Sequence, residues 1–259
     1  MTPNKYQVPA LMKASLILDM LSRKDADLAE IMTEYNLPKS STYSLLLTLE
    51  EIGFVRRVLG GNRYTLGFRL FELGNLAVAK ISIRDQAGPF LKELSRKENV
   101  TCHLGILDDN EAVYLIKVDP DDAILINSWE GKHLALTCSA MGKVLLAWLP
   151  ANRQKELLDA ATFTRKTPST ITSRKEFQDH LLSVKDQGWA IDNEEDIVGI
   201  KCLAAPLFSF NNDVQYSMSI SGTTQKMTEE RIQPLTQSLL ETAGNISKAL
   251  GYREDNSNA

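Results

Sequence analysis

The feature of the sequence that most restricts its fold is a helix break at residues 36–38, Asn-Leu-Pro, between two amphipathic helical patterns. Apolar residues recur at helical spacing over residues 28–35 before the break and over 45–52 after it. Asp27 is a residue type that caps helix starts, and Gly53 is one that ends helices. Two short helices joined by so tight a turn predict a helix-turn-helix.

Neighbouring patterns complete a small domain around this motif. Residues 8–23 repeat apolar side chains at helical spacing and predict a preceding helix. The runs 54–58 and 63–66 flank a Gly-Gly-Asn turn at 60–62, which is a hairpin signal. Three helices and a hairpin predict a winged helix-turn-helix over residues 1–67.

The charge of the chain is unevenly distributed. The 259 residues carry a formal net charge of −4. Residues 36–69 contain five basic and two acidic side chains, a net charge of +3, which leaves −7 for the rest. The length favours two domains. A short basic segment in an acidic protein indicates that an anionic partner docks on one of them.

The helix after the break has the composition of a DNA recognition helix. In a helix-turn-helix, the second helix places its N-terminal turn in the major groove, which favours small polar or basic side chains there. Backbone N–H groups at a helix start also bind phosphate. We therefore predict double-stranded DNA as a partner. The predicted contacts are Lys39, Ser40, Ser41, Thr42, Tyr43 and Ser44 on the helix, and Arg56, Arg57 and Arg63 on the hairpin.

The remaining sequence predicts a linker helix at 68–82, an α+β domain over 83–252 and a polar tail at 253–259. Short apolar or β-branched runs between turns predict strands, and apolar residues at helical spacing predict helices. The predicted helices are 83–97, 139–148, 152–160, 173–188 and one capped by Thr228, and the predicted strands are 101–107, 112–118, 123–128, 201–208 and 214–221. Helices covering a largely antiparallel sheet make this domain α+β.

Reactive residues are present, but their spacing does not favour catalysis. Cys102 and His103 are adjacent on a predicted strand, so their side chains lie on opposite faces and do not pair as nucleophile and base. We expect His103 to line a pocket or to be a satisfied core residue. Cys102, Cys138 and Cys202 are odd in number and far apart, so we predict reduced thiols and no disulfide, metal site or cofactor.

Membrane and targeting signals are missing from the sequence. No apolar run approaches the ~18–20 residues that span a bilayer, and the first thirty residues lack a secretory pattern. We expect a cytoplasmic protein without membrane contact. The acidic run at 192–196 is expected to form a loop with one inward carboxylate and three solvated ones.

Four separated motifs resemble the IclR family of bacterial transcriptional regulators: KSSTYSLLLTLEEIGFVRR, YTLGFRLFELG, SAMGKVLLAWLP, and DNEEDIVGIKCLAAPLF with SMSISGT. The resemblance covers about residues 8–252, and TCHLGILDDNEAVYLIKVD is most similar to the ketodeoxygluconate regulator branch, which controls sugar-acid catabolism. It implies a winged helix, a linker helix and a GAF-like effector-binding domain with a curved antiparallel sheet. It also implies homodimers formed through the DNA-binding domains, often paired into homotetramers, and a pseudo-palindromic operator.

The resemblance also implies a pocket for a small carboxylate-bearing effector, a small organic acid. Backbone N–H groups at a helix start suit a carboxylate, and two serines two apart on a strand share a face. Two alternatives remain: the serines pair only with neighbouring strands, and Cys202 is an inert buried residue. The bulk of Met141 can shrink or reshape the pocket. The implied positions are Ile126, Leu134, Ser139, Ala140, Met141, Gly142, Asp192, Cys202, Ser219 and Ser221.

Two functions from different classes fit these observations. In the first, the protein is a ligand-switched transcriptional regulator of a carbohydrate or sugar-acid catabolic operon, acting as a repressor or, alternatively, as an activator. In the second, the α+β domain is a small-molecule enzyme fused to a helix-turn-helix. The sequence lacks a positioned nucleophile, acid–base pair or metal cluster, which favours the first function and predicts that the protein is not an enzyme.

Overall fold

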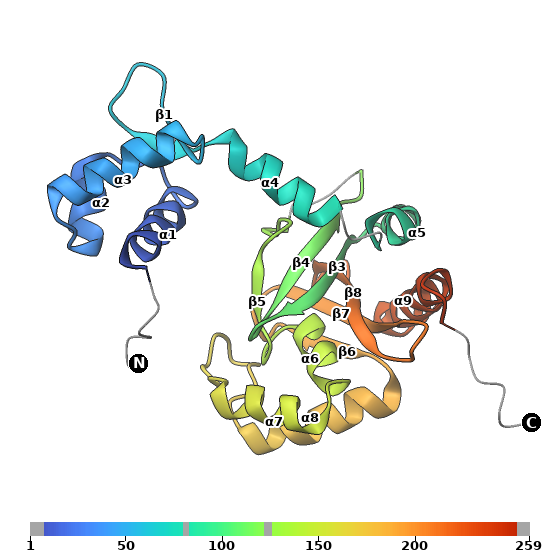
Figure 1. Cartoon of the computed structure of the whole chain (residues 1–259). Coiled ribbons are helices and arrows are strands. Elements are labelled where there is room, and N and C mark those ends of the chain that lie inside the picture. The colour runs from blue at the N-terminus through green and yellow to red at the C-terminus, as the bar shows by residue number, and fades with distance from the viewer. Residues whose placement is uncertain (1–7, 80–82, 122–125, 253–259) are drawn as a thin grey trace, which may run out of the picture. The chain divides into compact units, whose positions relative to one another are not determined.

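The computed structural model describes residues 8–79, 83–121 and 126–252 (Figure 1). The chain divides into two compact units, Met1–Ile81 and Ser82–Ala259. Each unit has its own core, and each is described by itself below. The predicted linker helix is α4, Phe68–Ala79, which belongs to the first unit.

The first unit is a winged helix-turn-helix, as the sequence predicts. Asp27 caps α2 through a reciprocal capping box with Glu30, and Asn36 ends this helix in the left-handed conformation at φ 49°. Gly53, at φ 77°, ends the recognition helix α3. The elements are α1 Pro9–Leu21, α2 Leu28–Tyr35, α3 Lys39–Glu51, β1 Val55–Arg57 and β2 Tyr64–Leu66, followed by α4.

A single apolar cluster holds these elements together. Ile17 of α1, Ile31 of α2 and Leu46 of α3 are fully buried against one another. Tyr64 of β2 joins the same cluster, and its backbone pairs with Ala26 just before α2. Ile52, predicted to lie on the buried face, is instead 47% exposed because α3 ends at Glu51 and the chain turns away.

The second unit is a six-stranded antiparallel sheet with helices on both faces (Figure 1). The strand order is β5-β4-β3-β8-β7-β6, so the long central strands come from both ends of the unit. The strands are β3 Thr101–Asp108, β4 Glu111–Val118, β5 His133–Ala135, β6 Ala190–Asn193, β7 Ile200–Phe208 and β8 Val214–Thr223. The helices are α5 Ile83–Glu98, α6 Ala140–Ala147, α7 Ala151–Ala160, α8 Arg174–Gln187 and α9 Glu229–Ala249.

Strand alternation separates the two faces of this sheet. α5 and α9 pack together on one face, and α6 and α8 pack together with the other, as Figure 1 shows. Ala204 belongs to the core beneath α6, so its neighbours Leu203 and Ala205 point toward the α9 side. On β8, the register that pairs Ala204 with Ser219 places that serine on the α6 side.

Three sequence predictions about strands are corrected by the structure. The predicted strand 123–128 lies partly outside the described residues, and its described part, 126–128, is not a strand. β5 and β6 were not predicted, because they have only 3 and 4 residues. Runs so short carry too few alternations to separate a strand from a loop. Among the helices in the described ranges, none is long and apolar enough to cross a membrane.

Candidate functional site

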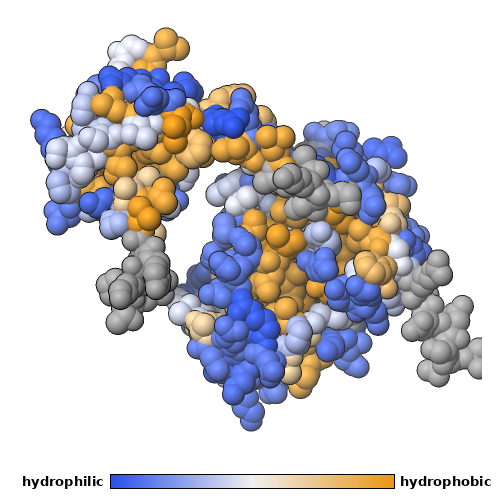
Figure 2. Space-filling view, viewed as in Figure 1, coloured by the Kyte–Doolittle hydropathy of each residue, from blue (hydrophilic) through white to orange (hydrophobic). Residues whose placement is uncertain are grey.

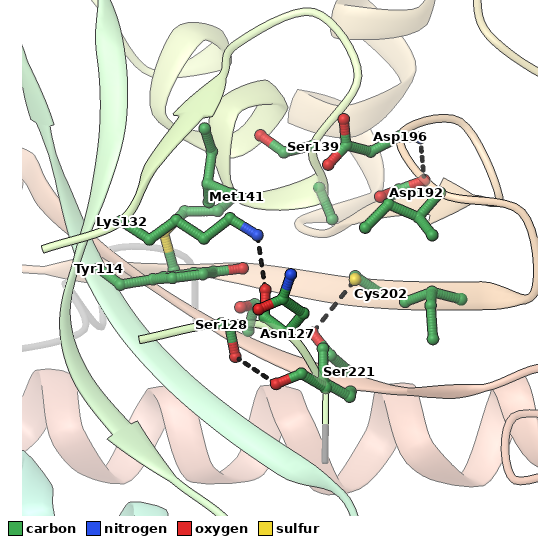
Figure 3. A pocket seen from close by; sticks show the side chains of 16 residues that line it. Tyr114, Asn127, Ser128, Lys132, Ser139, Met141, Asp192, Asp196, Cys202 and Ser221 are labelled. Carbon is green, nitrogen blue, oxygen red and sulfur yellow. Dashed lines mark hydrogen bonds between the residues drawn. The ribbon is translucent and has the colours of Figure 1, made fainter. Parts of the chain in front are cut away.

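A cavity of about 40 Å³ lies between the start of α6 and the sheet of the second unit. Nine of the ten predicted effector positions line it, although they come from six separate segments of the chain. Figure 3 shows these side chains converging from both sides of the cavity. The nine are Ile126, Leu134, Ser139, Ala140, Met141, Asp192, Cys202, Ser219 and Ser221; the other lining residues are Tyr114, Asn127, Ser128, Lys132, Asp196, Ile197 and Ile200.

Neighbouring strands supply the polar floor of the cavity. Register pairs Asp192 with Cys202 and Cys202 with Ser221, so the three side chains form one row across β6, β7 and β8. The Ser221 hydroxyl donates to the Cys202 sulfur at 3.1 Å. Ser219 is 1% exposed; its hydroxyl makes no hydrogen bond of normal geometry to a described residue, and the Tyr114 hydroxyl lies near it. A buried hydroxyl without a partner is costly, which makes Ser219 a position where a ligand gains a hydrogen bond.

Asp192 is the buried acid of the cavity. Its Oδ1 accepts hydrogen bonds from the backbone N–H groups of Glu195 at 2.7 Å and Asp196 at 3.4 Å. Burial raises the pKa of the Asp192 carboxyl to about 7, an effect that the nearby Glu195 carboxylate reinforces. Near neutral pH the group therefore exists as both carboxylic acid and carboxylate, so it can donate or accept a hydrogen bond.

The start of α6 forms the opposite wall. Ser139 caps the helix by accepting a hydrogen bond from the Gly142 N–H at 3.1 Å. Because that N–H is taken, and because Gly142 does not line the cavity, the predicted role of Gly142 in effector binding is corrected to a packing role. The first-turn N–H groups of Ala140 and Met141 have no intrahelical acceptor, as at any helix start.

Met141 lines the cavity and packs into the space beside Gly105. Its side chain is 2% exposed, and its sulfur lies 2.5 Å from the position that a Cβ would occupy at Gly105. The missing side chain of Gly105 on β3 therefore makes room for the methionine. A β-bulge between Leu104 and Gly105 lies at the same point of the strand.

Sequence reasoning missed five polar residues around the cavity: Tyr114, Asn127, Ser128, Lys132 and Asp196. His103, for which a pocket-lining or core position was expected, is fully buried, stacks on Tyr114 at 4.0 Å and bonds the Ser128 hydroxyl at 2.9 Å through Nε2. Burial lowers the pKa of His103 to about 3, so the imidazole is neutral. Tyr114 is on a predicted strand, and alternation with its neighbours could have found it. Lys132 lies in a loop, where no periodicity marks it.

A buried ion pair joins the two walls of the cavity. The Lys143 ammonium, on a fully buried side chain one turn into α6, lies 2.5 Å from Glu195 Oε1 and donates to the Ile191 carbonyl at 2.8 Å. The sequence predicted one inward carboxylate in the run 192–196. The structure buries two, Asp192 and Glu195, because Lys143 provides an internal partner that the local sequence does not reveal.

The recognition helix α3 exposes most of the predicted DNA-contacting residues. Its cap residue, Pro38, provides no side-chain hydrogen bond, which leaves the first-turn N–H groups free to bind phosphate. Thr42 is corrected: it is fully buried, and its hydroxyl donates to the Pro38 carbonyl at 2.9 Å. The remaining predicted residues of the helix start are at least partly exposed: Lys39, Ser40, Ser41, Tyr43 and Ser44.

The three arginines of the wing are exposed, but two of them have acidic partners. Arg57 lies 3.3 Å from Glu50 and over the Tyr64 ring, and Arg63 lies 3.1 Å from Glu30. Neither Arg56 nor Lys39 takes part in an ion pair within the described ranges. Solvent-exposed pairs of this kind contribute little free energy, so both paired arginines remain able to exchange a carboxylate for a phosphate.

Both units match known proteins. The sequence model of the IclR helix-turn-helix domain matches residues 10–59, and that of the bacterial transcriptional regulator IclR C-terminal domain matches residues 75–248. The chain is 36% identical to the HTH-type transcriptional regulator RhmR of Escherichia coli over 95% of each protein. It is 34% identical to the HTH-type transcriptional regulator KdgR of the same organism, covering 95% of this chain and 94% of KdgR.

A solved structure agrees with these matches. The crystal structure of IclR from Thermotoga maritima superposes with a TM-score of 0.77 at 36% identity, covering 93% of this chain and 98% of that one. The two family models together span most of the chain in the expected order, and the winged helix-turn-helix and the curved antiparallel sheet occupy the matched segments. The protein is therefore a DNA-binding transcriptional regulator that belongs to the IclR family.

Proposed function

We propose that this regulator represses a carbohydrate or sugar-acid catabolic operon and is released from its operator by a small carboxylate-bearing metabolite. The observation that carries the proposal is the convergence of nine implied effector positions on one cavity. A ligand changes operator affinity when it binds the DNA-free and DNA-bound states of the dimer with different free energies. The similarity to KdgR supports the sugar-acid assignment.

We infer that the acting species is a homodimer joined through the first unit. α1 and its N-cap residue Val8 carry an exposed apolar face, which continues at helical spacing through Leu11, Met12 and Leu16. On α4, Phe68 is 73% exposed and lies beside the exposed Phe71. Figure 2 shows apolar surface on this unit. A two-fold dimer formed here requires a pseudo-palindromic operator.

The regulator proposal is tested by a mobility-shift assay with DNA from upstream of the protein's own gene. We expect a shifted complex at low salt and its dissociation on addition of the cognate acid. Absence of a complex at low salt would contradict the proposal. A promoter reporter separates the two modes of action: deletion of the regulator raises expression if it is a repressor and lowers expression if it is an activator.

Removing cations from the recognition surface should weaken DNA binding. We expect Lys39→Ala and Arg57→Ala each to lower operator affinity and to reduce the slope of log affinity against log salt by about 1, the effect of one lost phosphate contact. Fluorescence anisotropy at several salt concentrations measures both quantities. Lys155→Ala, an exposed lysine on α7, is the matched control and should change neither. An unchanged salt slope for both test variants would remove them from the DNA interface.

A charge on the apolar face of α1 should dissociate the dimer. We expect Leu11→Glu to shift the protein toward monomer in sedimentation velocity and to weaken operator binding, because a dimer contact would bury an unpaired carboxylate. Leu11 is 69% exposed in the chain, so its replacement does not disturb the monomer core. Leu182→Glu, a 70% exposed leucine on α8, serves as the control. A Leu11→Glu protein that stays dimeric would exclude this face.

A further inference from the structure

The cavity contains one cation, Lys132, for which the described structure provides no acidic partner. Its ammonium donates to the Asn127 carbonyl at 2.6 Å and lies 5.1 Å from the centre of the Trp129 ring. None of the ion pairs between described residues includes it. Figure 3 shows the ammonium end on the cavity side, where it meets the backbone carbonyl of Asn127 in the same loop.

The acids of the cavity are already engaged elsewhere. Asp196 lies 2.5 Å from the Lys166 ammonium, and Asp192 accepts backbone hydrogen bonds from its own loop. The charge of Lys132 therefore has no acidic partner among the described residues, in a cavity that the first turn of α6 also lines. At the sheet end, the buried hydroxyl of Ser219 makes no hydrogen bond of normal geometry within the described part of the chain. A ligand complementary to this arrangement has an anionic group at one end and a hydroxyl or carbonyl oxygen at the other.

The volume of the cavity indicates what such a ligand displaces. About 40 Å³ holds only a few water molecules and is far below the ~300 Å³ of typical metabolite pockets. Lys132 and Asn127, which the bond from the ammonium to the Asn127 carbonyl joins, both line the cavity. A carboxylate is a stronger acceptor for an ammonium than a neutral carbonyl, so a bound acid replaces that carbonyl on Lys132.

We propose that Lys132 determines the ligand specificity of this site: it selects a small hydroxy or keto acid, whose carboxylate bonds to the Lys132 ammonium while an oxygen at its other end bonds to Ser219. This inference rests on the proposed effector function and assigns the charge preference to one residue. Without Lys132 the site keeps its hydroxyl, thiol and carboxyl groups, and it no longer favours acids over their uncharged counterparts.

Paired ligands test the inference. The full-length protein is examined by thermal shift and calorimetry with D-gluconate, D-galacturonate, D-glycerate and pyruvate, and with the uncharged counterparts glucitol, galactose, glycerol and acetone. We expect at least one acid to stabilise the protein and its counterpart to bind much more weakly. Lys132→Met should then weaken the acid about 10- to 100-fold, the usual loss for a hydrogen bond to a charged group. Lys132→Arg should restore most of the preference.

The controls separate this inference from the regulator proposal. Lys155→Met removes an exposed lysine distant in sequence from the cavity-lining segments and should leave acid affinity unchanged. Equal binding of the acid by Lys132→Met and wild type, or equal binding of acid and uncharged counterpart by wild type, would overturn the role of Lys132. A panel in which no acid stabilises the wild type would overturn the ligand class. Neither outcome bears on the mobility shift with upstream DNA, which tests the regulator proposal by itself.

Discussion

Lys143→Met is expected to lower the free energy of unfolding of the second unit by about 3–5 kcal/mol, the cost of leaving one member of a buried ion pair alone. Glu195 is 5% exposed, and its Oε2 has no hydrogen-bond partner within the described ranges. Without the ammonium its carboxylate must take up a proton or draw water into the core. Urea unfolding followed by tryptophan fluorescence measures the change, because Trp129, Trp148 and Trp189 all lie in this unit.

Two control variants give this prediction its specificity. Arg174→Met breaks the exposed pair with Asp159 and should change stability by no more than about 1 kcal/mol. The double variant Lys143→Met with Glu195→Gln carries no unpaired charge and should recover much of the loss. A Lys143→Met protein within about 1 kcal/mol of wild type would show that the pair does not hold α6 to the loop of Asp192.

Met141→Ala is expected to destabilise the same unit by about 2–5 kcal/mol, the usual cost of replacing a buried methionine by alanine. The methionine is 2% exposed and its sulfur fills the space above Gly105. Its removal leaves that space empty and enlarges the adjoining cavity. Urea unfolding gives the stability change, and a crystal structure of the variant gives the new cavity volume.

A Met141→Leu variant shows whether the volume of this side chain or its chemical type determines the stability of the second unit. Met141→Leu keeps most of the volume and should cost less than about 1.5 kcal/mol. Leu182→Ala, at a 70% exposed position on α8, should have little effect. A Met141→Ala protein as stable as wild type, with a cavity of unchanged volume, would mean that neighbouring side chains collapse into the space and that Met141 does not set the pocket shape.

Much of the fold was predictable because its signals are local. The capping residue Asp27, the left-handed Asn36 and Gly53, and the hairpin turn mark their elements within a few residues of sequence. The long strands β3, β4, β7 and β8 and the helices around them follow from periodicity in the same way. The short strands β5 and β6 did not, because three or four residues carry no periodic signal and their pairing depends on a distant partner.

The candidate site was less predictable from the sequence than the fold. The family resemblance named nine residues that the fold brings together, yet it could not tell that Thr42 is buried or that the Gly142 N–H is occupied by Ser139. The burial of Thr42 depends on how α3 packs against the rest of the first unit, whereas the bond from the Gly142 N–H to Ser139 is a local helix cap between residues three apart. Lys132 was not identified because it lies in a loop, where no residue periodicity marks a side chain that lines a pocket.

The sequence by itself determined the two-domain order, the recognition helix with its basic wing, and the antiparallel class of the second domain, because these follow from residue spacing along the chain. Only the tertiary structure decided which buried charges meet. Lys143 and Glu195 are 52 residues apart and form an ion pair. Asp192, Cys202 and Ser221 form one row across three strands. Such contacts depend on how strands and helices distant in sequence are placed. In the sheet, a shift of one residue in the register of a strand would move each of its side chains to the opposite face.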